Sequence, residues 1–451
     1  MQELLKRVLK RLLPSKNLER KILKIKLLVF KKLKKVLPSD VEVLLCGSVA
    51  KGTYLKNNVD IDVFLLFGPN YPVAKIKKLG IFYAKKAFKG FKTEVRYAQH
   101  PYLKVFIKQL KIDIVPSSKI ENLQKIKTAV DRSQLHTLFI NSNLKEEQRN
   151  DVRLLKKFLD VLGVYGASLR VEGFSGYLCE LLILHYGSFI RLLQAVAYEW
   201  KKETIIDIKG FYKKEEALKK FFPATFIVVD PTDKNRNVAA VVSRTSFSRF
   251  ILAARKFLSK PQQKFFFSKP ISISLKSLKK KIIQRGSNCL VLTFLNPGLV
   301  EDILWPQLKK TATQLLSALE GEGFRTLGHY FYADEKTCFI LLELIDSNLP
   351  NIKHLVGPEI FDQDNINSFV LKHKNALNIH LEHYNIVAIE KRKITNAVAL
   401  LKEKLKNPTK LGIPKGLQKE IKNCKIYNAI DLLDNKAFFN IAVDYFLRKI
   451  Y

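Results

Sequence analysis

The chain has 451 residues, of which 79 are Lys or Arg and 41 are Asp or Glu, so its formal net charge is +38 at pH 7. The length suggests two to four domains, and the apolar content of 47% is that of ordinary globular proteins. A surface this positive attracts polyanions, which makes nucleic acid the first candidate partner. A Lys-rich composition alone would raise the charge as well.

Cysteine spacing and hydropathy argue against two further classes of protein. The five Cys residues lie far apart and form no C-x-x-C pair, which argues against a zinc site and indicates a reduced, cytoplasmic setting. No apolar run reaches the length of a membrane span, so no membrane association is expected. The basic, Leu-rich residues 1–35 contain Glu3 and Glu19 and few Ser, which favours a packed amphipathic helix over a transit peptide.

The first third of the chain predicts an α+β domain. Residues 1–36 have helical periodicity, which ends at Pro38-Ser39-Asp40. The elements expected after it are the strand Val41–Cys46, the strand Ile61–Phe67, the helix Val73–Phe88, and the strands Glu94–Ala98, Tyr102–Ile107 and Lys111–Val115. Such an order predicts a small mixed sheet with helices packed on it.

The middle of the chain predicts a helical domain. Long amphipathic helices are expected over Glu146–Leu162, Ser175–Trp200 and Asn237–Leu258, and Lys260-Pro261 indicates the next boundary. We therefore expect domains over residues 1–135, 136–259 and 260–451.

The last region predicts an α/β architecture. Its expected elements are an extended Lys264–Ser274, a short helix Leu275–Gln284, a strand Asn288–Phe294, a helix Pro297–Glu320 interrupted at Pro306, paired strands Phe324–Tyr332 and Lys336–Leu344, and a mainly helical Asn385–Tyr451. A strand-helix-strand-strand order is typical of small domains that bind RNA.

Three aspartates and a Gly-Ser turn carry the clearest chemical signal. Asp60 and Asp62 open an apolar strand and, two residues apart, project from the same face. Neighbouring carboxylates are stable together mainly around a divalent cation, and oxygen-only ligands favour Mg²⁺. Asp113 lies inside a later apolar run and supplies a third carboxylate, while Gly47-Ser48 upstream can offer amides and a hydroxyl to a phosphate. Three carboxylates at one sheet edge could hold two Mg²⁺ ions, one at the attacking hydroxyl and one at the triphosphate, and such an arrangement indicates nucleotidyl transfer by a two-metal mechanism.

The same set, in this order, resembles the nucleotidyltransferase superfamily that includes DNA polymerase β. Four further stretches are similar to signatures of the archaeal (class I) CCA-adding enzymes: residues 128–137, TAVDRSQLHT; residues 154–167, with LLKKFL and GVYGA; residues 173–181, GFSGYLCEL; and residues 229–239, VDPTDKNRNVA. The resemblance covers about residues 40–260. Beyond that it depends on length and layout, with Val356-Gly357-Pro358 as a weak echo.

The resemblance implies a fold and a set of roles. It implies a polymerase β-like catalytic domain, a helical middle domain and α/β C-terminal RNA-binding domains. Its implied roles are Asp60, Asp62 and Asp113 as metal-binding catalytic carboxylates, Gly47, Ser48 and Lys51 at the triphosphate, His136, Lys156 and Tyr165 at the nucleotide, and Arg236 in the base-selecting pocket. The family usually has arginine where this chain has Lys51, and lysine loses the bidentate fork on phosphate.

Four of these roles also have a plainer interpretation. His136 could be a satisfied structural side chain, and Lys156 could be a solvated residue of a basic helix. Tyr165, between Gly163 and Gly166, could simply pack rather than stack on a base. Arg236, near two aspartates, could form an ordinary salt bridge.

The resemblance implies template-free addition of C, C and A to the 3′ end of tRNA. The substrates would be CTP and ATP, the cofactor Mg²⁺, and the by-product pyrophosphate, with the C-terminal half holding the acceptor arm. A homodimer is one assembly that the resemblance raises. Three alternatives stay open: a poly(A) polymerase, a 2′-5′ oligoadenylate synthetase, and a catalytically silent RNA-binding protein.

Overall fold

The computed structural model describes residues 1–57, 59–97, 100–120, 128–213, 215–222, 224–268 and 271–447. It divides into two compact units, the first ending at Pro270 and the second beginning at Ile271. The predicted boundary between residues 135 and 136 lies within the first unit, and the three predicted domain ranges stay predictions. Among the described residues, no single helix is long and apolar enough to cross a membrane.

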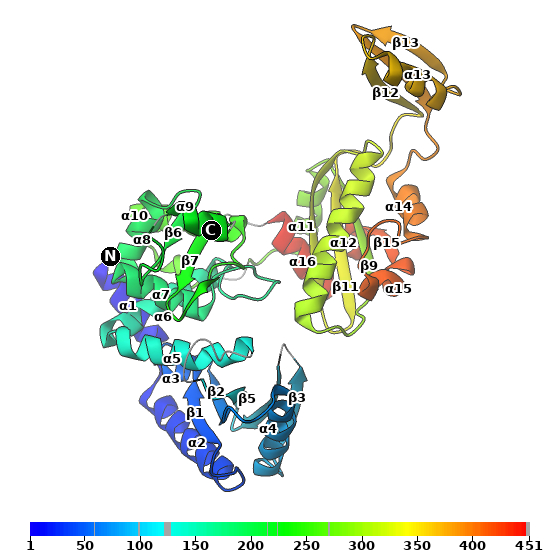
Figure 1. The fold of residues 1–451 in the computed structure, drawn as a ribbon. Helices are drawn as coiled ribbons and strands as arrows, with labels where there is room; N and C mark the ends of the chain where they lie inside the picture. The colour runs from blue at the N-terminus through cyan, green and yellow to red at the C-terminus, as the bar shows by residue number, and fades with distance from the viewer. Residues whose placement is uncertain are drawn as a thin grey trace. The chain divides into compact units, whose positions relative to one another are not determined.

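The first unit begins with helices packed on a five-stranded mixed sheet (Figure 1). Its helices are α2 (Lys16–Lys34), α3 (Gly47–Ala50) and α4 (Val73–Ala87), whereas α1 (Gln2–Leu12) packs against the later helices of this unit. Its strands are β1 (Glu42–Cys46), β2 (Asp60–Phe67), β3 (Lys92–Tyr97), β4 (Pro101–Ile107) and β5 (Leu110–Ser118), in the order β1-β2-β5-β4-β3. Only the β2–β5 pair is parallel. The predicted mixed sheet is confirmed, and Ala98 lies outside the described residues.

Strand β2 separates a core face from a functional face. Ile61, Val63, Leu65 and Phe67 are fully buried in the cluster that α2 and α4 complete. The alternate positions begin with Asp60 and Asp62 and continue into a smaller apolar cluster. Because strand side chains alternate, burial of one face fixes the register and therefore fixes where both carboxylates project.

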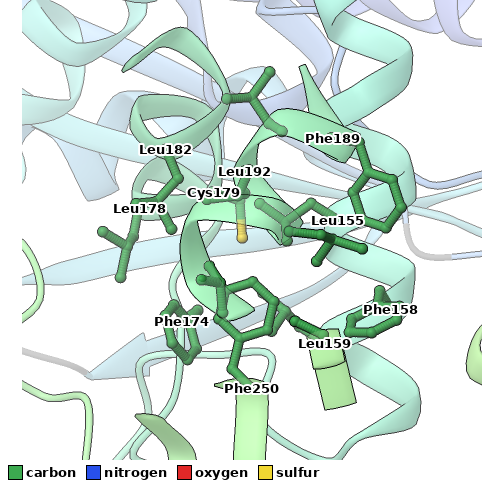
Figure 2. Packing of buried hydrophobic residues seen from close by; sticks show 14 of the residues in the cluster. Leu155, Phe158, Leu159, Phe174, Leu178, Cys179, Leu182, Phe189, Leu192 and Phe250 are labelled. Atoms are coloured by element: carbon green, nitrogen blue, oxygen red, sulfur yellow. The ribbon is translucent and has the colours of Figure 1, made fainter. Parts of the chain in front are cut away.

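The rest of the first unit is helical, with one small sheet. Its helices are α5 (Arg132–Asn143), α6 (Glu146–Val161), α7 (Gly176–Tyr186), α8 (Phe189–Tyr198), α9 (Glu215–Phe221) and α10 (Arg244–Ser259), with short 3₁₀ turns η2 (Ala129–Asp131) and η3 (Gln263–Phe265). Its strands are β6 (Thr204–Ile206), β7 (Phe226–Asp230) and β8 (Asp233–Asn237), a sheet that the sequence did not predict. Side chains of α6, α7, α8 and α10 pack together in one buried hydrophobic cluster, part of which is drawn in Figure 2.

Three expectations for the first unit are wrong in detail. The predicted helix Ser175–Trp200 is two helices bent by 90°, because Gly187 has φ +84° and ends α7. Asn237, where the predicted helix begins, is instead the last residue of strand β8. Helix α10 begins at Arg244, because Ser243 is its N-cap and accepts a hydrogen bond from the backbone N–H of Ser246. Part of the expected extended stretch is the 3₁₀ turn η3, and residues 269–270 lie outside the described residues.

The second unit contains a four-stranded sheet, ordered β10-β11-β9-β15, between two layers of helices (Figure 1). Its strands are β9 (Asn288–Leu295), β10 (Thr326–Ala333), β11 (Thr337–Leu344) and β15 (Lys425–Asn428). Its helices are α11 (Leu275–Ile283), α12 (Glu301–Gly321), α14 (Ala397–Leu405), α15 (Lys415–Lys422) and α16 (Lys436–Phe446), with the turn η4 (Ala429–Leu432). Helices α12, α14 and α15 pack on one face, and α11 and α16 on the other.

The order β9-α12-β10-β11 confirms the predicted strand-helix-strand-strand pattern. The predicted interruption at Pro306 is wrong, because α12 runs through it; the proline lies in the second turn, where it removes one backbone bond. A separate three-stranded sheet, β12 (Ile352–Glu359), β14 (Asn385–Lys391) and β13 (Asn378–Glu382), carries α13 (Gln363–Lys372). Since β14 and β15 are strands, the expectation of a mainly helical end after residue 385 is wrong in part.

Candidate active site

The turn after β1 is shaped by a glycine that has no room for a side chain. Gly47 has φ +71°, and a Cβ added to it would lie 1.9 Å from Asp62 Oδ2. Glycine is required here for two reasons: it tolerates the positive φ, and it lets the backbone approach the Asp62 carboxylate closely. Ser48 follows in α3, so the predicted Gly-Ser turn lies directly against the predicted metal ligands.

The three aspartates lie on neighbouring strands. Asp62 of β2 is in register with Asp113 of β5, and Asp60 precedes Asp62 on the same face. The pocket in front of them has a volume of about 230 Å³, and its lining residues are Ser48, Thr53, Tyr54, Leu55, Asp60, Asp62, Asp113, Lys156 and Tyr165. Six of the ten predicted site residues therefore meet in one pocket.

Two of the carboxylates, those of Asp62 and Asp113, are costly to charge where they lie. Burial, followed by the neighbouring charges of Asp113 and Asp60, raises the pKa of Asp62 to about 7. Burial also raises the pKa of Asp113, although the ammonium of Lys104 opposes this shift from 3.1 Å. Raised carboxylate pKa values indicate a place where an added cation would be strongly favourable.

The type of donor atom in the pocket fits a divalent cation, but the present spacing of the side chains does not. Asp60, Asp62 and Asp113 would hold the ion, because their oxygens are the donor type that Mg²⁺ prefers. Among the described residues, however, no group of three or more His, Cys, Asp or Glu side chains is already spaced around one metal position. Asp113 is instead ion-paired with Lys104. Metal binding would therefore require side-chain rearrangement.

Behind the pocket lies a buried cluster of two lysines and one glutamate. Glu180 of α7 accepts hydrogen bonds from Lys51 Nζ at 2.5 Å, Thr53 Oγ1 at 2.5 Å and Lys156 Nζ at 3.3 Å. Burial raises the pKa of Glu180, but the two lysines more than offset it and hold the pKa below its usual value. Lys51 is thus bound to Glu180 in this structure and is absent from the pocket lining, while Lys156 reaches the pocket.

Helix α6 fixes the loop that carries Thr53. Arg153 donates to the carbonyl oxygens of Gly52 at 2.5 Å and of Tyr54 at 3.2 Å, and Lys156 donates to that of Thr53 at 3.1 Å. One helical turn therefore holds three successive carbonyls of the loop between α3 and β2. The helical part of the first unit positions this wall of the pocket.

The other two predicted residues, His136 and Arg236, meet at a buried carboxylate. Asp230 Oδ2 lies 2.9 Å from His136 Nε2 and accepts a hydrogen bond from Arg236 Nη1 at 2.7 Å. Burial raises the pKa of Asp230, but the hydrogen bonds from His136, Thr232 and Arg236 more than offset it and keep the pKa below its usual range. Burial lowers the pKa of His136, and the hydrogen bond to Asp230 opposes this shift.

Tyr177 connects this second group to the first. Its hydroxyl donates to Asp230 Oδ1 at 3.0 Å, and its ring stacks on His136 with centroids 3.8 Å apart. The Lys51 ammonium lies 5.6 Å from the same ring centroid. A continuous series of contacts thus runs from Glu180 through Lys51 and Tyr177 to Arg236.

Comparison with known proteins agrees with this geometry. Family models match residues 27–136 (nucleotidyltransferase domain), 150–267 (tRNA nucleotidyltransferase, second domain) and 285–428 (CCA-adding enzyme, C-terminal domain). The CCA-adding enzyme of Methanothermobacter thermautotrophicus is 36% identical over 88% of this chain and 85% of its own. That of Methanocaldococcus jannaschii is 36% identical over 92% and 93%. The chain belongs to the CCA-adding enzymes.

Family membership confirms the resemblance drawn from the motifs and the α+β fold with a nucleotidyltransferase catalytic domain. It also extends past residue 260, where the motifs gave little support. Among solved structures, a cytoplasmic RNA terminal U-transferase covers 60% of this chain and 100% of its own, with 18% identity and a TM-score of 0.45. The individual residue roles in this CCA-adding enzyme stay predictions.

Sequence reasoning missed three residues that organise the site of this CCA-adding enzyme, Thr53, Tyr177 and Glu180, and it considered a fourth, Asp230, only as a salt-bridge partner of Arg236, a pairing that the structure contains. Glu180 had a usable signal, because a carboxylate within the otherwise apolar helix 176–186 needs a buried partner. Asp230 closes the fully buried strand β7 and gave the same signal. Thr53 and Tyr177 gave none, since their roles depend on contacts distant in sequence.

Replacing Glu180 with Gln is expected to destabilise this CCA-adding enzyme by about 3–5 kcal/mol, because two buried ammonium groups lose their counter-charge. Chemical denaturation would measure the loss. The double variant Glu180→Gln/Lys51→Gln removes one charge of each sign and should recover part of it. Equal stability of the single variant and the wild type would contradict the described charge balance.

Proposed function

We propose that this enzyme adds C, C and A in turn to the 3′ end of tRNA, using CTP and ATP without a nucleic-acid template. The observation that carries the proposal is the pocket itself: three aspartates on β2 and β5, the Gly47-Ser48 turn against them, and Lys156 at the other wall, in a chain of the CCA-adding family. Poly(A) polymerase and 2′-5′ oligoadenylate synthetase activities would need the same carboxylates, and the products distinguish them.

The residues divide the reaction between them. The backbone of the Gly47-Ser48 turn and the Ser48 hydroxyl would bind the triphosphate, and Lys156 would add positive charge to the same side of the pocket. Asp113 would lie nearest the attacking 3′-hydroxyl, and Asp60 and Asp62 nearest the triphosphate. Mg²⁺ bound by these aspartates would lower the pKa of that hydroxyl and neutralise the departing pyrophosphate.

The second group is suited to reading a base. Asp230 fixes the planar guanidinium of Arg236, which is about one-third exposed, and the imidazole of His136. A held guanidinium presents its remaining N–H groups in one plane, as the edge of a base requires. Tyr165, in the pocket lining, offers a ring for stacking. Lys51 would reach the triphosphate only after leaving Glu180, which fits the weaker phosphate grip expected of lysine at this position.

The second unit supplies a place to hold the RNA. A pocket of about 860 Å³ between α12, β14 and α14 is lined by seven Lys or Arg residues and three Glu residues. Among the described residues, Lys391, Lys393 and Lys410 form no ion pair there. The lining contains no aromatic side chain, which favours contacts to backbone phosphates over stacked bases.

The triple variant Lys391→Ala/Lys393→Ala/Lys410→Ala is therefore expected to weaken tRNA binding about tenfold and to reduce the slope of log K against log salt by about 3. Filter binding at several salt concentrations measures both. The control is Lys279→Ala/Lys280→Ala/Lys281→Ala on exposed positions of α11, which packs on the opposite face of the sheet. Equal losses in both variants would show that charge alone matters and that this pocket has no special part.

Three further elements belong to the proposal. We propose Mg²⁺ as the working cation, because the ligands are oxygens only. A cytoplasmic location agrees with five free cysteines and with the processing of tRNA. A homodimer is proposed from the family resemblance alone, and the mass of the protein in solution would decide it.

The test is incorporation of labelled CTP and ATP into a tRNA that lacks its terminal CCA. The expected product gains C, C and then A, and stops. Long A tails would indicate poly(A) polymerase, 2′-5′ linked oligoadenylate without tRNA would indicate the synthetase, and tRNA binding without incorporation would indicate a silent RNA-binding protein. Asp113→Ala is the control, and near-normal incorporation by that variant would refute the role given to Asp113.

A further inference from the structure

The three carboxylates of the pocket do not have equal surroundings. Asp60 and Asp62 form no ion pair among the described residues. Asp113 forms one, with Lys104 of β4, whose Nζ lies 3.1 Å from Asp113 Oδ1. The two residues are direct cross-strand partners in the β4–β5 ladder, so the pairing is built into the register of the sheet.

Lys104 occupies this position in partly buried surroundings. The side chains of Lys104 and Asp113 are only 18% and 16% exposed, and Asp113 Oδ1 has no well-formed hydrogen bond within the described part of the chain. The lysine charge is therefore the main compensation for that oxygen.

We propose that Lys104 acts as a built-in substitute for a metal ion, competing with a divalent cation for Asp113. A cation held by Asp60 and Asp62 meets no such competitor, whereas one that needs Asp113 must displace the ammonium. The enzyme would then fill its cation positions in order, and the Asp113 position would be the weaker. This inference rests on the proposed function only in taking the three aspartates as the metal ligands.

The experiment measures Mn²⁺ binding to the full chain by calorimetry, without RNA or nucleotide. Wild type should show a tighter and a weaker class of site. In Lys104→Met the weaker class should tighten about tenfold and the tighter class much less, because Lys104 contacts Asp113 directly and acts on Asp60 and Asp62 only from a distance. Lys104→Arg keeps the charge and should bind the weaker ion no more tightly than wild type.

Two controls make the result specific. Lys111→Met removes a nearby exposed charge of β5 that forms no ion pair in the described structure and acts on Asp113 less strongly than Lys104 does, so it should change the ratio between the two classes much less than Lys104→Met. Asp113→Asn should abolish the weaker class. Thermal unfolding of each variant shows whether it is folded, and Lys104→Gln, which also removes the charge, takes the place of Lys104→Met if that variant is unstable.

Two results would overturn the inference. One is an unchanged Mn²⁺ affinity of both site classes in Lys104→Met. The other is the same tightening of both site classes in Lys104→Met as in Lys111→Met. Its failure is distinguishable from failure of the proposed function. Normal CCA addition with no effect of Lys104 on Mn²⁺ binding refutes the competition alone. Absence of CCA addition with the expected Mn²⁺ pattern refutes the proposed reaction alone.

Discussion

Replacing Asp62 with Asn is expected to abolish nucleotide incorporation while making the metal-free protein more stable. Loss of a metal-binding carboxylate should lower the rate by at least about 10³-fold. In the absence of metal, however, the charged carboxylate lowers the stability of the folded protein, because burial and the adjacent carboxylates raise its pKa to about 7. The amide has the same shape and no charge, and should stabilise the fold by up to about 4 kcal/mol at pH 8.

The direction of the pH dependence follows from the same shift. A carboxyl whose pKa is raised in the folded state reduces stability as the pH rises from the unfolded value near 4 through about 7, and costs nothing below that range. The stability gain of Asp62→Asn should therefore be absent near pH 3.5 and complete above pH 7. Urea denaturation in EDTA at several pH values measures it. A variant less stable than wild type at pH 8 would contradict the described electrostatics.

Replacing Gly47 with Ala is expected to lower incorporation by about 10²-fold or more. The added Cβ would lie 1.9 Å from Asp62 Oδ2, so the carboxylate must move, and small displacements of a catalytic group are costly. The positive φ of +71° adds about 1–2 kcal/mol of backbone strain. Single-turnover incorporation, together with thermal unfolding, separates the two effects.

The matched control is Gly90→Ala. Gly90 also has a positive φ, +85°, but a Cβ there would meet nothing within 4 Å. It should lose a similar amount of stability through strain and keep its incorporation rate. If both alanine variants lost activity equally, the close approach of the Gly47 backbone to Asp62 would have no functional importance.

Much of the fold was predictable because apolar periodicity is a local property. The strands β1, β2, β4 and β5 and the helices α4 and α6 lie close to the predicted ranges. The errors occurred where tertiary context decided the outcome. Gly187 ends a helix within a continuously apolar stretch, and β14 pairs with two strands, β12 and β13, that contain no buried residue.

The site was predictable to the extent that its residues share strands or neighbouring turns. Asp60 and Asp62 share a face by their spacing alone, and Gly47 marks a tight turn. Their meeting with Asp113 depends on the parallel pairing of β2 with β5, which no local pattern specifies. The ion pair between Lys51 and Glu180 joins residues 129 positions apart, so no local sequence pattern predicts it either.

The most direct test of the central claim is diffraction at the manganese absorption edge from crystals soaked with Mn²⁺ and a non-hydrolysable CTP analogue. We expect anomalous peaks in contact with the carboxylates of Asp60 and Asp62, with Asp113 joining after Lys104 turns away, and the triphosphate against Gly47 and Ser48. Mn²⁺ bound elsewhere, with the three aspartates unmoved and free of metal while the analogue is in the pocket, would contradict the account.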